Sequence, residues 1–120
     1  MASIYEQIGG QEALIAVVDD LYRRVLADSQ LAPFFAGANM SRVKGKQVEF
    51  FAAALGGPDE YSGQPMKAVH QGMGIDQVHF DLVAKYIREA LAACGVLDDT
   101  ADAIIEIVAP LSEDIVSTTT

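Results

Sequence analysis

The sequence predicts an all-α fold, and three observations support this prediction. In several long segments, apolar residues recur every three or four positions, which is the period of an amphipathic helix. Glycine, proline and short polar stretches separate these segments, as they do at connections between helices. Alternation of apolar and polar residues, which is typical of a strand, is weak throughout. A chain of 120 residues can bury a core, so we expect one domain over residues 1–120 with a frayed end at 117–120.

The N-terminal part of the chain predicts a short helix, a long helix and a turn. Residues 3–6 (SIYE) have the spacing of a capping box and open a short helix that the glycine pair at 9–10 ends. A long helix follows over about residues 11–27, with acidic residues early and arginines late, as the helix dipole favours. After a polar break at 28–30, the apolar stretch at 31–35 predicts one irregular helical turn.

A further helix is predicted over about residues 42–55, with Ser41 as its N-cap. The sequence Gly-Gly-Pro at 56–58 ends it, and a loop-like composition continues to residue 64. The polar side chain of Gln47 is set inside the apolar stripe of this helix, which makes it either an ordinary helix-edge amide or a group with a function.

A very short helix with a single histidine follows. Pro65 suits a first helical position and Gly72 a position just past a helix end, so His70 lies near the exit of about two turns. A lone histidine in an apolar segment can simply be a core residue with satisfied hydrogen bonds. With no Cys, His or carboxylate at metal-site spacing beside it, His70 cannot build a protein-only zinc site. It could be the single axial ligand of a haem iron, because the porphyrin supplies the other four bonds.

Two helices are predicted after residue 74. Asp76 could cap a long helix that runs to about residue 94. A last helix, started by Asp98 or Asp99, is predicted over about residues 100–116. Pro110 lies inside that pattern and should kink the helix or remove one hydrogen bond.

Charge and cysteine content exclude several classes of function. The net charge of −9 argues against a nucleic-acid or anionic-membrane partner, although Arg42, Lys44 and Lys46 cluster. The single cysteine, Cys94, permits no internal disulfide, which fits a reducing cytoplasm, and we expect it to be a small buried apolar side chain. We expect no signal peptide, since no basic segment followed by an apolar stretch opens the sequence, and no membrane span, since no apolar run approaches about 18 residues.

Two polar side chains on apolar helix faces are candidate ligand-binding groups. Dioxygen bound to iron gains partial negative charge and is stabilised by hydrogen-bond donors in an apolar space. The phenol of Tyr22 and the amide of Gln47 could supply such donors. Gln47 shares a helix face with Val43 and Phe51, because the three residues are four positions apart. Taken alone, Tyr22 is better explained as a tyrosine at the edge of the core with a hydrated hydroxyl.

Three further residues have open roles. Phe34 and Phe35 could wedge against a flat ring or simply pack in the core. His79 is the rival metal ligand, but it opens a helix and is better explained as bonding to nearby backbone or water. Motifs such as HExxH, CxxC and G-x-S-x-G are absent from the sequence.

Several of these segments, in this order, resemble the group I truncated haemoglobins over nearly the whole chain. The likeness is strongest to the mycobacterial-type branch associated with nitric oxide detoxification. It rests on residues 3–10 (SIYEQIGG), 34–35 (FF), 40–51 (MSRVKGKQVEFF), 55–58 (LGGP), 66–72 (MKAVHQG) and 79–80 (HF).

The resemblance implies a two-over-two sandwich of α-helices around haem b, iron protoporphyrin IX. It implies that His70 is the proximal iron ligand and that Tyr22 and Gln47 form the distal pair that hydrogen-bonds dioxygen. Val43 falls where larger globins place a distal histidine, and Phe51 matches an aromatic proposed to gate an apolar tunnel. Other positions match residues that pack against the haem or approach a propionate: Phe35, Met66, Phe80 and Val83 for packing, and Lys46 among the basic residues for the propionate.

Three functions remain open from the sequence. The first is a haem protein that binds dioxygen and, with an external reductase, converts nitric oxide to nitrate, with an apolar route for both gases along Leu14, Val18, Phe51 and Val108. The second is a carrier, store or sensor that binds dioxygen or carbon monoxide without significant turnover. The third is a helical interaction module without a cofactor, against which the joint presence of His70, Tyr22 and Gln47 argues.

Overall fold

The computed structural model describes residues 3–57 and 75–111, and every regular element within these ranges is helical. The α-helices are α1 (Ile4–Ile8), α2 (Gly10–Ala27), α3 (Met40–Ala54), α5 (Gln77–Ala93) and α6 (Asp98–Val108), with short 3-10 turns η1 (Ala32–Phe35) and η2 (Ala109–Leu111). The all-α prediction is therefore confirmed. In these ranges, none of the helices combines the length and apolar character needed to cross a bilayer.

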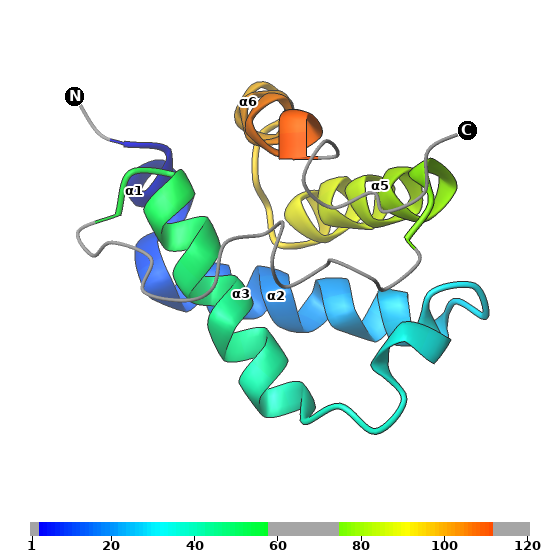
Figure 1. The fold of residues 1–120 in the computed structure, drawn as a ribbon. Coiled ribbons are helices and arrows are strands. Elements are labelled where there is room, and N and C mark those ends of the chain that lie inside the picture. Colours follow the sequence, from blue (N-terminus) through cyan, green and yellow to red (C-terminus); the bar gives the residue numbers. More distant parts are fainter. Residues whose placement is uncertain (1–2, 58–74, 112–120) are drawn as a thin grey trace.

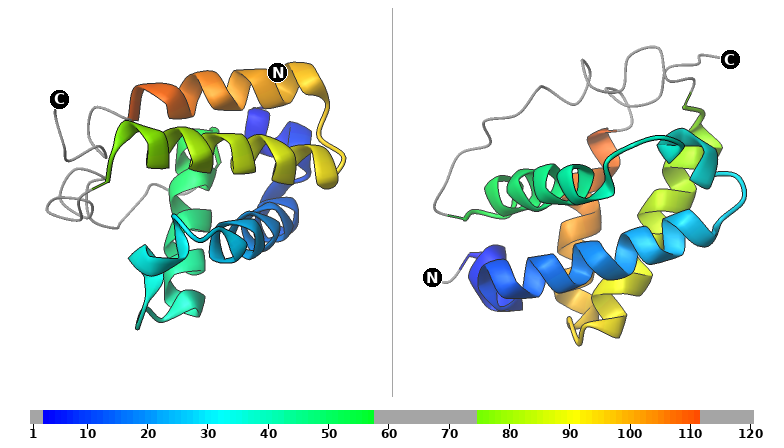
Figure 2. Two further views of the ribbon diagram at one scale, coloured as in Figure 1. Left: turned by 90° about the vertical axis from the view of Figure 1, so that its right-hand side faces the viewer. Right: turned by 90° about the horizontal axis from the view of Figure 1, so that it is seen from below.

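The helices are arranged as two packed pairs. Helix α2 packs against α3 and against α5, and α5 packs against α6 (Figure 1). Seen from the side, the α5–α6 pair lies over the pair formed by α2 and α3 (Figure 2). This is the two-over-two sandwich that the family resemblance implies. Helices α2 and α5 join the layers, because each contacts both the partner in its own layer and a helix of the other layer.

The predicted N-terminal cap is confirmed. The Ser3 side chain accepts a hydrogen bond from the Glu6 backbone N–H at 3.2 Å and so satisfies a donor in the first turn of α1. Gly9 then adopts a left-handed conformation with φ of 115°, which a side chain would disfavour. The chain can therefore turn at once, and α2 begins at Gly10.

The predicted N-cap of α3 was wrong. Asn39, and not Ser41, caps this helix: its side-chain oxygen accepts from the Arg42 N–H at 3.2 Å. Asn and Ser are about equally good caps. Asn39 has the required extended backbone, so the helix begins at Met40, two residues earlier than predicted.

The last helix is shorter than the predicted 100–116. Helix α6 begins at Asp98 and ends at Val108, and Pro110 lies in the 3-10 turn that follows. Proline lacks the N–H that the helical ladder needs and its ring would clash with the preceding turn, which explains why the α-helix stops there. Residues 112–116 lie outside the described residues.

A continuous core connects the two layers. Its buried side chains come mainly from α2, α5 and α6, with Leu31, Phe51 and Leu55 added from the segment between α2 and residue 57. Cys94, predicted to be buried, is instead exposed, because it follows the last residue of α5 at the point where the chain turns away. It is therefore no part of this core.

Replacing Leu14 by alanine is expected to lower the free energy of unfolding by about 2–5 kcal/mol, because the lost contacts leave a cavity in the core. Leu14 is 1% exposed, whereas its neighbour Ile15 is 44% exposed. The matched control Ile15→Ala should cost less than about 1 kcal/mol. Urea unfolding of both variants measures the difference, and equal costs would contradict the assigned core.

Candidate functional site

The structure brings Tyr22 and Gln47 together. The Tyr22 hydroxyl donates a hydrogen bond to the Gln47 side-chain oxygen at 3.2 Å, across the contact between α2 and α3. Tyr22 lies on the buried stripe of α2 that also contains Val18 and Val25, because these positions are separated by one turn of helix. Their proximity is a structural finding, whereas their role toward a ligand stays a prediction.

Both side chains can donate hydrogen bonds in an apolar environment. Tyr22 is only 7% exposed, and burial raises the pKa of its phenol to about 12. The phenol therefore keeps its proton at neutral pH. Within the described part of the chain, the Gln47 side-chain nitrogen has no hydrogen-bond partner, so its amide can offer N–H donors to an incoming group.

An aromatic wall lies beside this pair. The ring of Phe35, in η1, packs edge-on against the ring of Tyr22 with centroids 5.5 Å apart. Phe34, its neighbour, packs edge-on against the His79 ring at 4.9 Å. The turn between α2 and α3 is thereby in contact with both Tyr22 and the beginning of α5.

The other predicted pocket residues have different degrees of burial. Phe51 and Phe80 are buried in the core, whereas Val43 and Val83 are half-buried and pack against it. Lys46 is exposed and forms an ion pair with Glu49, with 3.3 Å between its nitrogen and the carboxylate. The predicted ligand His70 and the packing residue Met66 lie outside the described residues.

The local role predicted for His79 is confirmed. Its Nδ1 accepts a hydrogen bond from the Asp76 backbone N–H at 3.1 Å, at the start of α5. Among residues 3–57 and 75–111, no group of three His, Cys, Asp or Glu side chains could hold a metal ion. The described residues therefore offer a donor pair and apolar walls, which suit a small polar ligand and a flat apolar cofactor.

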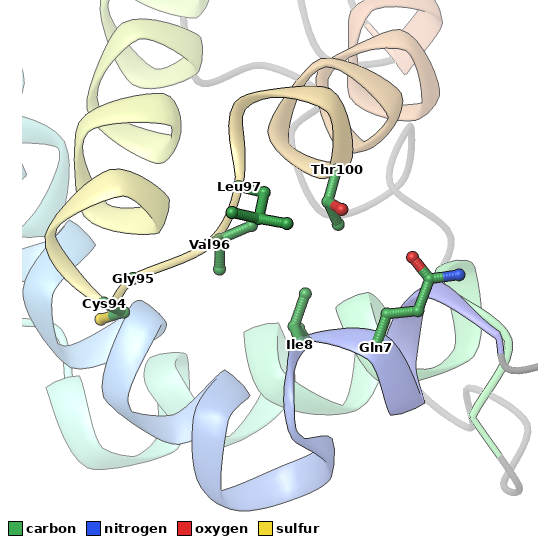
Figure 3. A pocket seen from close by; sticks show the side chains of 7 residues that line it. All are labelled: Gln7, Ile8, Cys94, Gly95, Val96, Leu97 and Thr100. Atoms are coloured by element: carbon green, nitrogen blue, oxygen red, sulfur yellow. The ribbon is translucent and has the colours of Figure 1, made fainter.

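A groove elsewhere on the molecule carries no comparable chemistry. It has a volume of about 310 Å³ and lies between the end of α1 and the loop that joins α5 to α6 (Figure 3). Its lining consists of Gln7, Ile8, Cys94, Gly95, Val96, Leu97 and Thr100. Although the Cys94 residue is exposed, partial desolvation of its thiol raises the pKa of this group, and the nearby Asp20 carboxylate adds to this effect, so the reactive thiolate is disfavoured.

Two polar contacts were missed from the sequence. Tyr86 in α5 donates a hydrogen bond to the Asp28 carboxylate at 2.5 Å, and Asp20 is buried between Arg23 and Arg24. An aspartate just after a helix is a known sign of a local turn. The identity of its partner, 58 positions away, has no signal in the sequence.

Comparison with known proteins agrees with this architecture. The model of the bacterial-like globin family matches residues 3–117. The group 1 truncated haemoglobin GlbN of Mycolicibacterium paratuberculosis is 60% identical over 95% of this chain and 84% of its own length. GlbN of Nostoc sp. is 43% identical over 87% of this chain and 89% of its own.

Solved structures give the same result. The truncated haemoglobin of Tetrahymena pyriformis in its Fe(III) form superposes with a TM-score of 0.93 and 31% identity, over 98% of this chain and all of the other. The 2/2 haemoglobin of Synechococcus sp., in the cyanomet state with covalently attached haem, superposes with a TM-score of 0.88 and 34% identity. The match covers 94% of this chain and 95% of the other. The two-over-two helical sandwich, with a buried tyrosine bonded to a half-buried glutamine, is that of a small globin. The chain belongs to the group 1 truncated haemoglobins.

Proposed function

We propose that this chain binds haem b, binds dioxygen reversibly on it, and uses that oxygen to convert nitric oxide to nitrate. The observation that carries the proposal is the hydrogen bond between the buried Tyr22 and the half-buried Gln47, which holds two potential donors beside apolar side chains. Membership of the truncated haemoglobins supports the cofactor, since haem b is the usual form in this family. The described side chains fit it, because they combine apolar walls with neutral donors.

In this proposal, His70 would be the protein's single bond to the iron, and Met66, Phe35, Phe80 and Val83 would pack against the macrocycle. Lys46 pairs with Glu49 across an exposed surface and could exchange that partner for a propionate at little cost. When bound, the haem supplies an iron centre that takes up dioxygen and makes it reactive toward nitric oxide.

The distal side chains hold and orient the ligand. The Tyr22 hydroxyl can turn from the Gln47 oxygen toward a partly negative ligand, while the Gln47 nitrogen can donate to the same ligand. Donors to a charged group are each worth about 1.5–3 kcal/mol. Because burial keeps the Tyr22 phenol protonated, this contribution should persist through the neutral range.

Apolar side chains keep water away from the ligand. Val43 and Phe51 flank Gln47 along α3, one turn away on either side. Leu14, Val18, Phe51 and Val108 are buried in one core cluster, and we propose that small uncharged gases reach the haem along them. Exclusion of water also strengthens the hydrogen bonds inside the pocket.

The overall reaction consumes one dioxygen, one nitric oxide and one electron and yields one nitrate ion. An external reductase would have to supply this electron, because each turnover would leave the iron in the ferric state and dioxygen binds only the ferrous state. This requirement for reductant is the reason to place the proposed activity in the cytoplasm.

Stopped-flow mixing of the oxygenated ferrous protein with nitric oxide tests the proposal. We expect complete conversion to the ferric spectrum within the first second and about one nitrate per haem. Carbon monoxide in place of nitric oxide is the control, and it should only replace oxygen without oxidising the iron. Slow oxidation or less than stoichiometric nitrate would contradict the dioxygenase and favour an oxygen carrier, store or sensor.

A further inference from the structure

A hydrogen bond between two distant segments holds the turn beside the Tyr22–Gln47 pair. Tyr86, in the middle of α5, donates to the carboxylate of Asp28, the residue that follows α2, at 2.5 Å. The other Asp28 oxygen accepts from the Gln30 backbone N–H at 2.7 Å. The backbone oxygen of Asp28 also accepts from the N–H groups of Leu31 and Ala32. Asp28 thus organises the start of the turn with both its side chain and its backbone.

This turn continues directly into the aromatic wall of the site. Residues 32–35 form η1, and Phe35 at its end packs edge-on against the Tyr22 ring. An unbroken series of contacts therefore runs from Tyr86 through Asp28 and η1 to Phe35, Tyr22 and finally Gln47. The links Tyr86–Asp28, Phe35–Tyr22 and Tyr22–Gln47 each join different elements, so a shift of the turn relative to α5 would be passed to the Tyr22 ring.

The charge distribution strengthens this contact. The hydrogen bond from Tyr86, followed by that from the Gln30 N–H, lowers the pKa of the Asp28 carboxyl below its usual value. The same bond raises the pKa of the Tyr86 phenol. Asp28 is thus ionised and Tyr86 protonated at neutral pH, which gives a charge-assisted hydrogen bond of the stronger kind.

We propose that Tyr86 and Asp28 are positioning residues for the Tyr22–Gln47 pair and that they set how tightly this pair holds the bound ligand. The inference rests on the proposed function, since it assumes a ligand beside these two side chains. Leu31, which is buried in the core, also anchors the turn. The alternative is therefore that Leu31 suffices and the Asp28–Tyr86 bond contributes only to stability.

Oxygen release from the ferrous haem protein distinguishes these alternatives. Tyr86→Phe removes one hydroxyl and should speed release by about two- to ten-fold, as expected for the loss of one hydrogen bond. The carbon–oxygen stretching frequency of the carbon monoxide complex should move in the same direction as in Tyr22→Phe, by a smaller amount. Asp28→Asn keeps an accepting oxygen and should change both readings less than Asp28→Ala.

Arg88→Gln is the matched control. It removes another polar contact of α5, the ion pair from Arg88 to Asp102 in α6, and should leave release and stretching frequency unchanged. If Tyr86→Phe matches the wild type in both readings while Tyr22→Phe differs, the positioning role is refuted. The release rate and the stretching frequency are both measured without nitric oxide. A wild type that reacts slowly with nitric oxide would therefore refute the dioxygenase proposal and leave the positioning proposal intact.

Discussion

Replacing Tyr22 by phenylalanine is expected to speed dioxygen release by about 10- to 100-fold. The variant loses one hydroxyl hydrogen bond to a partly charged ligand, worth about 1.5–3 kcal/mol, and keeps the ring. The ring contact with Phe35 at 5.5 Å should therefore survive, so the change isolates the donor. Rapid mixing of the oxygenated protein with excess carbon monoxide measures the release rate.

The control for this variant is Tyr5→Phe, which removes a tyrosine hydroxyl from α1 and should leave the rate unchanged. Gln47→Leu should also speed release, and the double variant should be non-additive, because the two side chains are hydrogen-bonded to each other. An unchanged rate in Tyr22→Phe would mean that its hydroxyl serves only Gln47. Faster dioxygen release in Tyr5→Phe would mean that the Tyr22→Phe effect comes from a general loss of stability and not from a lost hydrogen bond to the ligand.

Local features of the fold could be predicted from the sequence, because their causes are local. Ser3 and Asp76 begin helices where the capping pattern indicates, and Pro110 follows the end of α6 as its missing N–H requires. The error in the predicted start of α3 has a local cause too. Asn39 and Ser41 are both competent caps, and only the backbone conformation at Asn39 decides between them.

The candidate site depends on packing that periodicity does not specify. The helical period places Gln47 on a face with Val43 and Phe51, but it does not say that this face meets Tyr22. That pairing was supplied by the resemblance to a family, and the hydrogen bond at 3.2 Å agrees with it. The contact from Tyr86 to Asp28 had no such support, since it depends on how α5 crosses the end of α2.

Replacing His70 by alanine is expected to abolish stable haem binding, because its imidazole is the single proposed protein bond to the iron. His79→Ala is the matched control and should retain haem. The Nδ1 of His79 already accepts the Asp76 N–H, so in its neutral form the ring proton resides on Nε2 and neither nitrogen has a lone pair to offer. Haemin titration followed at the Soret band measures both variants.

Free imidazole separates loss of the ligand from loss of the fold. In His70→Ala, an added imidazole can occupy the space of the missing side chain and should restore a Soret band if the pocket is intact. Circular dichroism of the same sample should show the helix content of the wild type. Retention of haem by His70→Ala together with its loss from His79→Ala would reverse the ligand assignment. It would then require α5 to begin differently in the haem-bound protein, because the capping bond of His79 and an iron bond through the same ring are incompatible in the neutral imidazole.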